Sequence, residues 1–174
     1  MSTSRRATGA AALLVMVTGV AGCGSSQLFH DSTTAASYQG GRVSVDQVDQ
    51  AVQGIKTAFG ANAATFDAKT AITYLLFADE FQRVAGENGG AVSAAQALGE
   101  FAQRKVSNPS TAAVTALRSN IALGNIGRNP QGVAEINKLL QQQSVQVNPR
   151  FGTWSKSNGV IATNEPWILS AKKS

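Results

Sequence analysis

The chain has few of the side chains that most often carry out chemistry. It contains one cysteine, Cys23, and one histidine, His30. A single thiol excludes an internal disulfide, and one residue of each kind is too few for a zinc site. His30 lies among small polar residues, so we expect a solvated linker residue that cannot form a Ser-His or Cys-His dyad within a fold. We therefore expect no catalytic residues, no metal site and no cofactor.

Concentrated charge is also missing. The formal net charge is +5, and two positive charges, Arg5 and Arg6, precede position 23, which leaves +3 for the rest of the chain. The other basic residues are scattered along the sequence and do not form the stripe that nucleic-acid binding needs. No role in binding nucleic acid is expected.

The longest apolar run is too short for a typical membrane span. Residues 7–22 are uncharged and mainly apolar, and Arg5-Arg6 precede them. A transmembrane helix needs about 20 predominantly apolar residues, and this run is shorter and diluted by threonine and glycine. A basic start, an apolar middle and small residues at the end are typical of a secretory signal peptide.

The end of this run carries a more specific motif. Val20-Ala21-Gly22-Cys23 resembles the lipobox of bacterial lipoproteins. The resemblance implies that diacylglycerol is attached to the Cys23 thiol, with acyl chains such as palmitate, and that residues 1–22 are removed. Because two acyl chains hold far better than one, we expect the protein to be anchored on the outer face of the cell membrane. The alternative is an uncleaved N-terminal anchor in which Cys23 is a bystander.

The rest of the chain divides into a tether and one domain. Residues 23–36 are rich in small polar side chains and predict a tether. Residues 37–174 are enough for one hydrophobic core and too few for two. The domain is predicted to open with a short hairpin, residues 36–39 and 42–44, which Gly40-Gly41 would join because glycine tolerates positive φ.

Five helix starts can be read from capping signals. They are the S-x-x-Q boxes at Ser44 and Ser93, the N-cap Asp67, and the Asn-Pro pairs at Asn108 and Asn129. The second helix, predicted from Asp67 to about residue 85, is apolar over so wide an arc that it should be central.

A strand is predicted after the helices. Residues 145–147 alternate between apolar and polar and should pair with the N-terminal hairpin, because a two-stranded ribbon alone is marginal. An irregular or short-strand tail with a turn at Asn158-Gly159 comes next. The predicted fold is mainly α with a small β element: about five helices, and a short N-terminal hairpin joined by a C-terminal strand.

This order of elements resembles the N-terminal domain of the SurA family of periplasmic chaperones. The likeness is carried by residues 39–49, by residues 84–95, and by Asn148-Pro149-Arg150-Phe151-Gly152-Thr153-Trp154, which is similar to the ending of lipid-anchored, SurA-like proteins of actinobacteria. It covers about residues 36–105 and 144–168. It implies a peptide-binding scaffold without the parvulin prolyl isomerase module that such proteins often carry.

Candidate binding residues lie on the second helix and in the tail. Arg150 is interpreted either as a buried cation that ties the tail to the helices or as a residue that faces a client. The tryptophans are interpreted as core or lid residues, or as ligand platforms. The residues predicted to bind peptide or to dock the tail are Tyr74, Phe77, Phe81, Arg150, Phe151, Trp154 and Trp167.

The sequence predicts a binding protein and not an enzyme. Its expected partners are unfolded or extended envelope polypeptides, bound in an apolar groove that the other short helices leave partly uncovered on the second helix. The membrane is the other expected partner, through the lipid anchor. The alternative is a structural or scaffolding lipoprotein that docks a single folded envelope partner.

Overall fold

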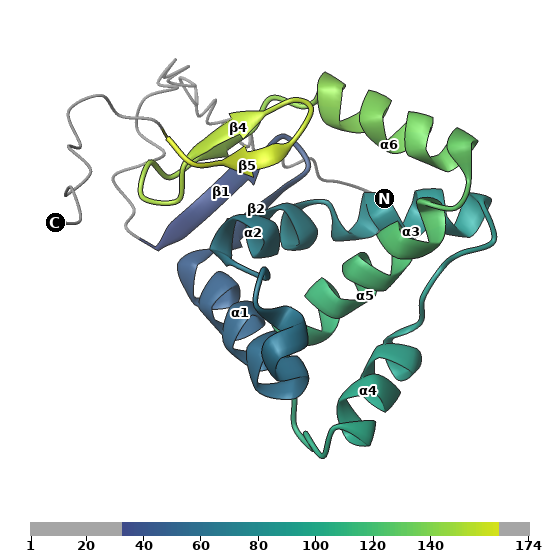
Figure 1. Cartoon of the computed structure of the whole chain (residues 1–174). Helices are drawn as coiled ribbons and strands as arrows, with labels where there is room; N and C mark the ends of the chain where they lie inside the picture. The colour runs from purple at the N-terminus through teal and green to yellow at the C-terminus, as the bar shows by residue number, and fades with distance from the viewer. Residues whose placement is uncertain (1–32, 164–174) are drawn as a thin grey trace, which may run out of the picture.

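The computed structural model describes residues 33–163, and these residues are mainly helical. They contain six α-helices, one 3-10 helix and five short strands. Figure 1 shows α5 in the middle of the helices and the strands gathered on one side. The helices are α1 (Val45–Phe59), η1 (Gly60–Ala63), α2 (Ala68–Leu76), α3 (Ala78–Glu87), α4 (Ala94–Gln103), α5 (Thr111–Ile126) and α6 (Pro130–Gln142). The strands are β1 (Thr34–Tyr38), β2 (Gly41–Ser44), β3 (Gln146–Val147), β4 (Thr153–Ser155) and β5 (Gly159–Ile161). The predicted fold class is confirmed.

Side chains just before the helices start them as predicted. Ser44 and Ser93 each form a full capping box, in which the serine hydroxyl accepts from the third helical N–H and the glutamine at that position bonds back to the cap N–H. Asp67 and Asn129 are N-caps too. Ser110, and not Asn108, caps α5, so the predicted start at Asn108 is wrong by two residues and Pro109 lies just outside that helix.

Three strands form the larger sheet, in the order β2-β1-β3. Strand β1 pairs antiparallel with β2, and on its other side with β3, where Ala36 is opposite Val147. The prediction that the strand after the helices joins the hairpin is therefore confirmed. The contact brings residues more than a hundred positions apart in the sequence side by side.

The predicted boundary between tether and domain is wrong by a few residues. Strand β1 already begins at Thr34, and Ala35 and Ala36 are fully buried. Their small side chains allow the strand to pack closely under the helices, which the polar composition of the segment does not reveal. The hairpin turn is also displaced, because Tyr38 pairs with Gly41, and neither Gly40 nor Gly41 adopts a positive φ.

The single helix predicted from Asp67 to about residue 85 is two helices, α2 and α3, which meet at Phe77. Phe77 has φ −109° and ψ 23°, outside helical values. The hydroxyl of Ser119 on α5 donates to the Tyr74 carbonyl at 2.8 Å. A side chain that inserts into the hydrogen-bond ladder is a known cause of a break, and here it comes from 45 residues away.

Helix α5 is the centre of the packing. It contacts α1, α2, α3 and α4, and eight of its residues are buried. A Cβ on Gly54 of α1 would lie 2.6 Å from the Cβ of Ala113, so α1 and α5 approach closely because one of them has no side chain there. The largest fully buried side chains are Phe77, Phe81, Phe101, Ile72, Val48, Val84 and Ser119.

The tail forms a second, two-stranded sheet. Strands β4 and β5 pair antiparallel, with Trp154 opposite Val160, and Gly159 provides the positive φ of the predicted turn. The N–H of Val160 reaches the hydroxyl of Thr73 at 3.4 Å, which joins this sheet to α2. Within residues 33–163, no helix is both long and apolar enough to cross a membrane.

Candidate functional site

The aromatic residues predicted on the second helix are mainly core. Phe77 is 0% and Phe81 1% exposed, and Tyr74 is half-buried. Helix α5 covers one side of α2 and α3, and β1, β2 and β5 cover α2 from another. The short strands and the tail cover most of what α5 leaves open, so the uncovered part of the apolar arc is limited to the stretch of α2 that carries Thr70 and Tyr74.

The tail docks onto this core through a tryptophan. The Trp154 ring lies 5.4 Å from the Phe77 ring, centroid to centroid, at 39°. The ring of Tyr38 lies 4.9 Å from Phe77 on another side, and its hydroxyl donates to Glu80. Burial, together with this bond and the charge of Glu80, raises the pKa of Tyr38. Trp154 is thus a docking residue, while Trp167, Cys23 and the lipobox residues Val20, Ala21 and Gly22 lie outside the described residues.

Arg150 is exposed and is not a buried cation. Its guanidinium carbon lies 4.6 Å from the centroid of the half-buried Phe151 ring, a cation-π distance. No carboxylate between residues 33 and 163 forms an ion pair with it. The interpretation of Arg150 as a buried cation that ties the tail to the helices is therefore wrong.

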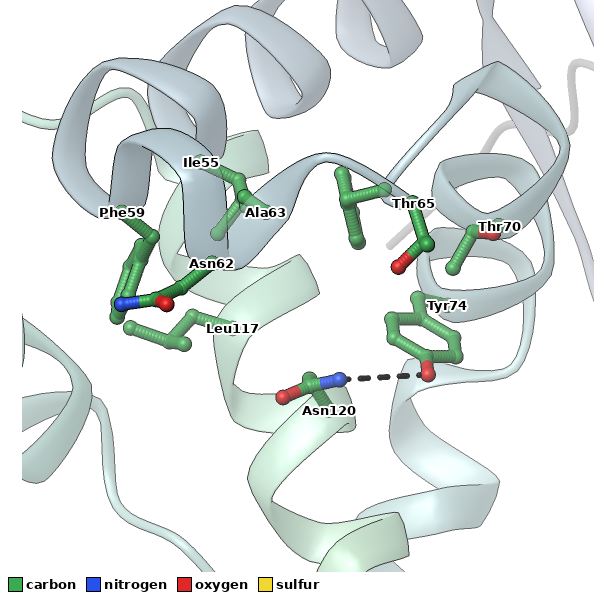
Figure 2. A pocket seen from close by; sticks show the side chains of 10 residues that line it. Ile55, Phe59, Asn62, Ala63, Thr65, Thr70, Tyr74, Leu117 and Asn120 are labelled. Atoms are coloured by element: carbon green, nitrogen blue, oxygen red, sulfur yellow. Dashed lines mark hydrogen bonds between the residues drawn. The ribbon is translucent and has the colours of Figure 1, made fainter.

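A pocket opens where the end of α1, η1, the start of α2 and the middle of α5 meet. Its volume is about 390 Å³, within the lower range of small-ligand pockets. Figure 2 shows Asn62, Phe59 and Leu117 along one side and Thr65, Thr70 and Tyr74 along the other, with Asn120 between them. The lining residues are Ile55, Phe59, Asn62, Ala63, Thr65, Phe66, Thr70, Tyr74, Leu117 and Asn120.

The floor of the pocket is apolar and firmly held. Ile55, Phe66 and Leu117 are 5–7% exposed. The Phe66 and Tyr74 rings pack at 5.9 Å, and Phe59 packs edge-on to the buried Phe101 at 6.0 Å. Walls tied to the core in this way form a cavity that exists before a ligand arrives.

The rim of the pocket is polar and exposed. Asn62, Thr65 and Asn120 are exposed, and the amide nitrogen of Asn120 lies 3.4 Å from the Tyr74 hydroxyl, a long contact that a ligand could replace. Each asparagine amide offers both donors and an acceptor, which is what a peptide backbone requires. Two such groups at the rim of an apolar floor can bind an extended chain.

None of the lining residues is charged. Asp67 lies behind Thr70, which donates to it through both backbone and hydroxyl. Burial raises the pKa of Asp67, whereas the hydrogen bonds from Thr70 and Lys69 lower it. The lowering is larger than the rise, so the pKa of Asp67 is below its ordinary value. Arg104 lies 4.1 Å over the Phe59 ring and pairs with Glu100 at 2.7 Å, so its charge is largely compensated. The pocket favours an uncharged ligand.

Sequence reasoning identifies only one residue of this pocket, Tyr74. Asn62 lies in a segment whose composition predicts only the end of the first helix, and Asn120 is one of several polar positions on α5. The pocket is assembled from three separate segments, and neither periodicity nor spacing connects them. Among residues 33–163 there is no group of three or more His, Cys, Asp or Glu side chains that could hold a metal ion.

A second hollow lies between α4 and α5. Its volume is about 400 Å³, and its lining includes Glu100, Gln96 and Gln103 but no aromatic ring. The apolar part of its lining consists only of small and branched side chains, such as Val92 and Ile121. The first pocket is therefore the better candidate site.

Comparisons of the chain with protein-family models, with curated proteins and with solved structures found no match.

Proposed function

We propose that this chain is a lipid-anchored protein of the cell envelope that binds extended, uncharged polypeptide segments in the pocket between α1, α2 and α5. The single observation that carries the proposal is the pocket itself, with its apolar floor and uncharged amide rim. It holds no nucleophile and base arranged for catalysis among its lining residues, so its chemistry is binding.

The position of the pocket suits a protein attached through Cys23. The N–H of Val45, the first residue of α1, donates to the Thr33 carbonyl at 2.7 Å, so α1 starts where the predicted tether joins the domain. Ile55 and Phe59 lie 10 and 14 residues further along α1. At about 1.5 Å per residue, the pocket is roughly 15–21 Å from the start of α1, where an envelope polypeptide can reach it.

An extended peptide matches the pocket in shape and polarity. One apolar side chain can occupy the floor formed by Ile55, Phe66 and Leu117, while the backbone on either side bonds to Asn62 and Asn120. The pocket is too small to accept a folded surface as a whole, and its neutrality means that affinity should depend little on salt.

The structure favours a narrower action than the capture of any unfolded chain. The large exposed apolar side chains of residues 33–163 are Leu98, Val133 and Ile161, which lie on three different elements. Scattered residues of this kind do not form the broad apolar patch of a general holdase. A surface with so few exposed apolar side chains favours the second candidate, a scaffold that docks one folded envelope partner.

Peptide binding can be tested at the rim. In the chain from Cys23 onward, Asn62→Ala combined with Asn120→Ala should weaken binding of uncharged extended peptides by about 5- to 150-fold, because two hydrogen bonds of roughly 0.5–1.5 kcal/mol each are lost. Asn108→Ala, an exposed loop asparagine, is the matched control. Fluorescence anisotropy over a peptide panel measures both, and equal affinities in the two variants would contradict the site.

Crosslinking in cells separates the two candidates. A photo-reactive residue in place of Thr65 should capture several unrelated polypeptides if the pocket binds extended segments, whereas one stoichiometric product indicates the scaffold. The same protein should not accelerate prolyl isomerisation, since rotation about that bond has a barrier of about 18–20 kcal/mol that only a shaped catalytic site lowers. Isomerase activity above buffer would contradict the binding-only proposal.

Attachment can be tested independently of the pocket. Cys23→Ala should abolish lipid labelling in cells and leave a longer, uncleaved precursor, because the chain has no other thiol. A variant that is processed and membrane-bound like the wild type would refute the lipoprotein part of the proposal.

A further inference from the structure

The end of the domain where the chain enters from the predicted tether also carries part of the tail. The backbone N–H of Asn148 donates to the Ala35 carbonyl at 2.9 Å, and its side-chain amide donates to the Thr34 carbonyl at 3.1 Å. The N–H of Arg150 in turn donates to the Asn148 side chain at 3.2 Å. Arg150 is therefore held within two residues of a direct contact with the first residues of β1.

An exposed isoleucine lies at the same end. Ile161 pairs with Thr153 across β4 and β5, and Gly152 is so close to the Ile161 carbonyl that no Cβ would fit between them. Ile161 is 41% exposed. Arg150 and Phe151 directly precede Gly152, which contacts the Ile161 backbone, and Arg150, Phe151 and Ile161 are here called the basal patch.

The chemistry of the basal patch is that of a membrane interface. Its guanidinium is exposed, lies over an aromatic ring and has no carboxylate partner in the described part of the chain. An arginine that covers apolar surface while keeping its charge outward can bind a lipid phosphate. The first turn of α1 carries an exposed acid, Asp46, which an anionic surface repels. The attraction to such a surface therefore comes from Arg150 alone.

We infer that the basal patch rests on anionic lipid headgroups, with the Arg150 guanidinium on a phosphate and Ile161 at the interface, so that the peptide pocket faces away from the membrane. The inference rests on the proposed anchor at Cys23. A tether of about ten residues keeps the domain near the surface at an effective concentration in the millimolar range, so a contact too weak to hold free protein still sets the orientation.

The lone thiol allows this to be tested apart from lipidation in cells. The chain from Cys23 onward is coupled through Cys23 to a maleimide lipid in vesicles of phosphatidylcholine with phosphatidylglycerol, and hydrogen exchange is compared with protein coupled to a soluble maleimide. Exchange should be several-fold slower over residues 148–153 and 159–162 and unchanged over residues 55–66. Protection at residues 55–66 instead would overturn the inference.

Matched charge and apolar variants sharpen the test. Arg150→Glu and Ile161→Asp should remove the protection, whereas Arg128→Glu and Val133→Asp, at exposed positions elsewhere, should keep it. Protection that is equal in pure phosphatidylcholine, or that survives Arg150→Glu, would overturn the role of anionic headgroups. If Cys23 is not acylated in cells, the anchor proposal fails while these vesicle results still decide the basal patch.

Discussion

The helices around α5 and the strands of the tail differ in how completely they are packed. Among the helices, Phe77, Phe81 and Phe101 are at most 1% exposed, and the fully buried Ser119 hydroxyl has a partner. In residues 146–163, three buried side-chain atoms lack a partner among the described residues: Gln146 Oε1, Trp154 Nε1 and Thr163 Oγ1. Because most buried polar groups in folded proteins are paired, these three atoms distinguish the tail from the helical core.

This difference locates the sites where binding can take place. A core closed on all sides cannot release its aromatic residues to a client without local unfolding, which costs a large part of the total stability. Binding therefore belongs to preformed surface hollows and not to the closed aromatic core. The proposed site is accordingly a pocket at α2, lined by Thr70 and Tyr74, and not a groove that runs along α2 and α3.

Removal of the tail tests the comparison with the largest expected effect. Deletion of residues 144–174 removes β3 from β1 and Trp154 from Phe77. Trp154 is half-buried, so its loss should cost less than the roughly 3–5 kcal/mol of a fully buried aromatic, but with β3 also removed the whole domain should melt at a markedly lower temperature in circular dichroism. Trp154→Ala should reproduce much of the loss. A deletion variant that melts at the wild-type temperature would show that the helices are stable without the tail.

The close approach of α1 and α5 allows the tight packing of the helices to be tested. Gly54→Ala places a methyl group against Ala113, and overpacking in a dense core costs about 1–3 kcal/mol. The double variant Gly54→Ala with Ala113→Gly should recover part of that stability, apart from the glycine penalty in α5. Denaturant unfolding measures the coupling, and purely additive effects would mean that the two positions do not press on each other.

The break between α2 and α3 offers a third test. Ser119→Ala removes the hydroxyl that bonds the Tyr74 carbonyl, which should cost about 1–3 kcal/mol because a buried acceptor is left without a partner. Thr115→Ala, one turn earlier on the same helix and half-buried, is the control. If both variants unfold at the same denaturant concentration as wild type, the hydroxyl is not what stabilises the break.

Local signals in the sequence predict part of this fold, and remote contacts decide the rest. The helix starts at Ser44, Asp67, Ser93 and Asn129 can be predicted because a cap and its partner lie within three residues of each other. The helix break cannot, since its cause, Ser119, is remote in sequence. The pocket escapes prediction for the same reason, because Asn62, Tyr74 and Asn120 come together only through packing.

The smallest expected effect comes from a glycine that has no packing role. Gly124 lies inside α5, is exposed, and has nothing within 4 Å of an added Cβ, so Gly124→Ala should stabilise the domain by up to about 1 kcal/mol through helix propensity alone. Gly132, buried in α6, is the matched contrast, because its added Cβ would lie 2.9 Å from the Ile126 side chain, and Gly132→Ala should destabilise. The two alanine variants should therefore shift the unfolding midpoint in opposite directions. A gain at both positions would show that α6 has room to move at its contact with α5.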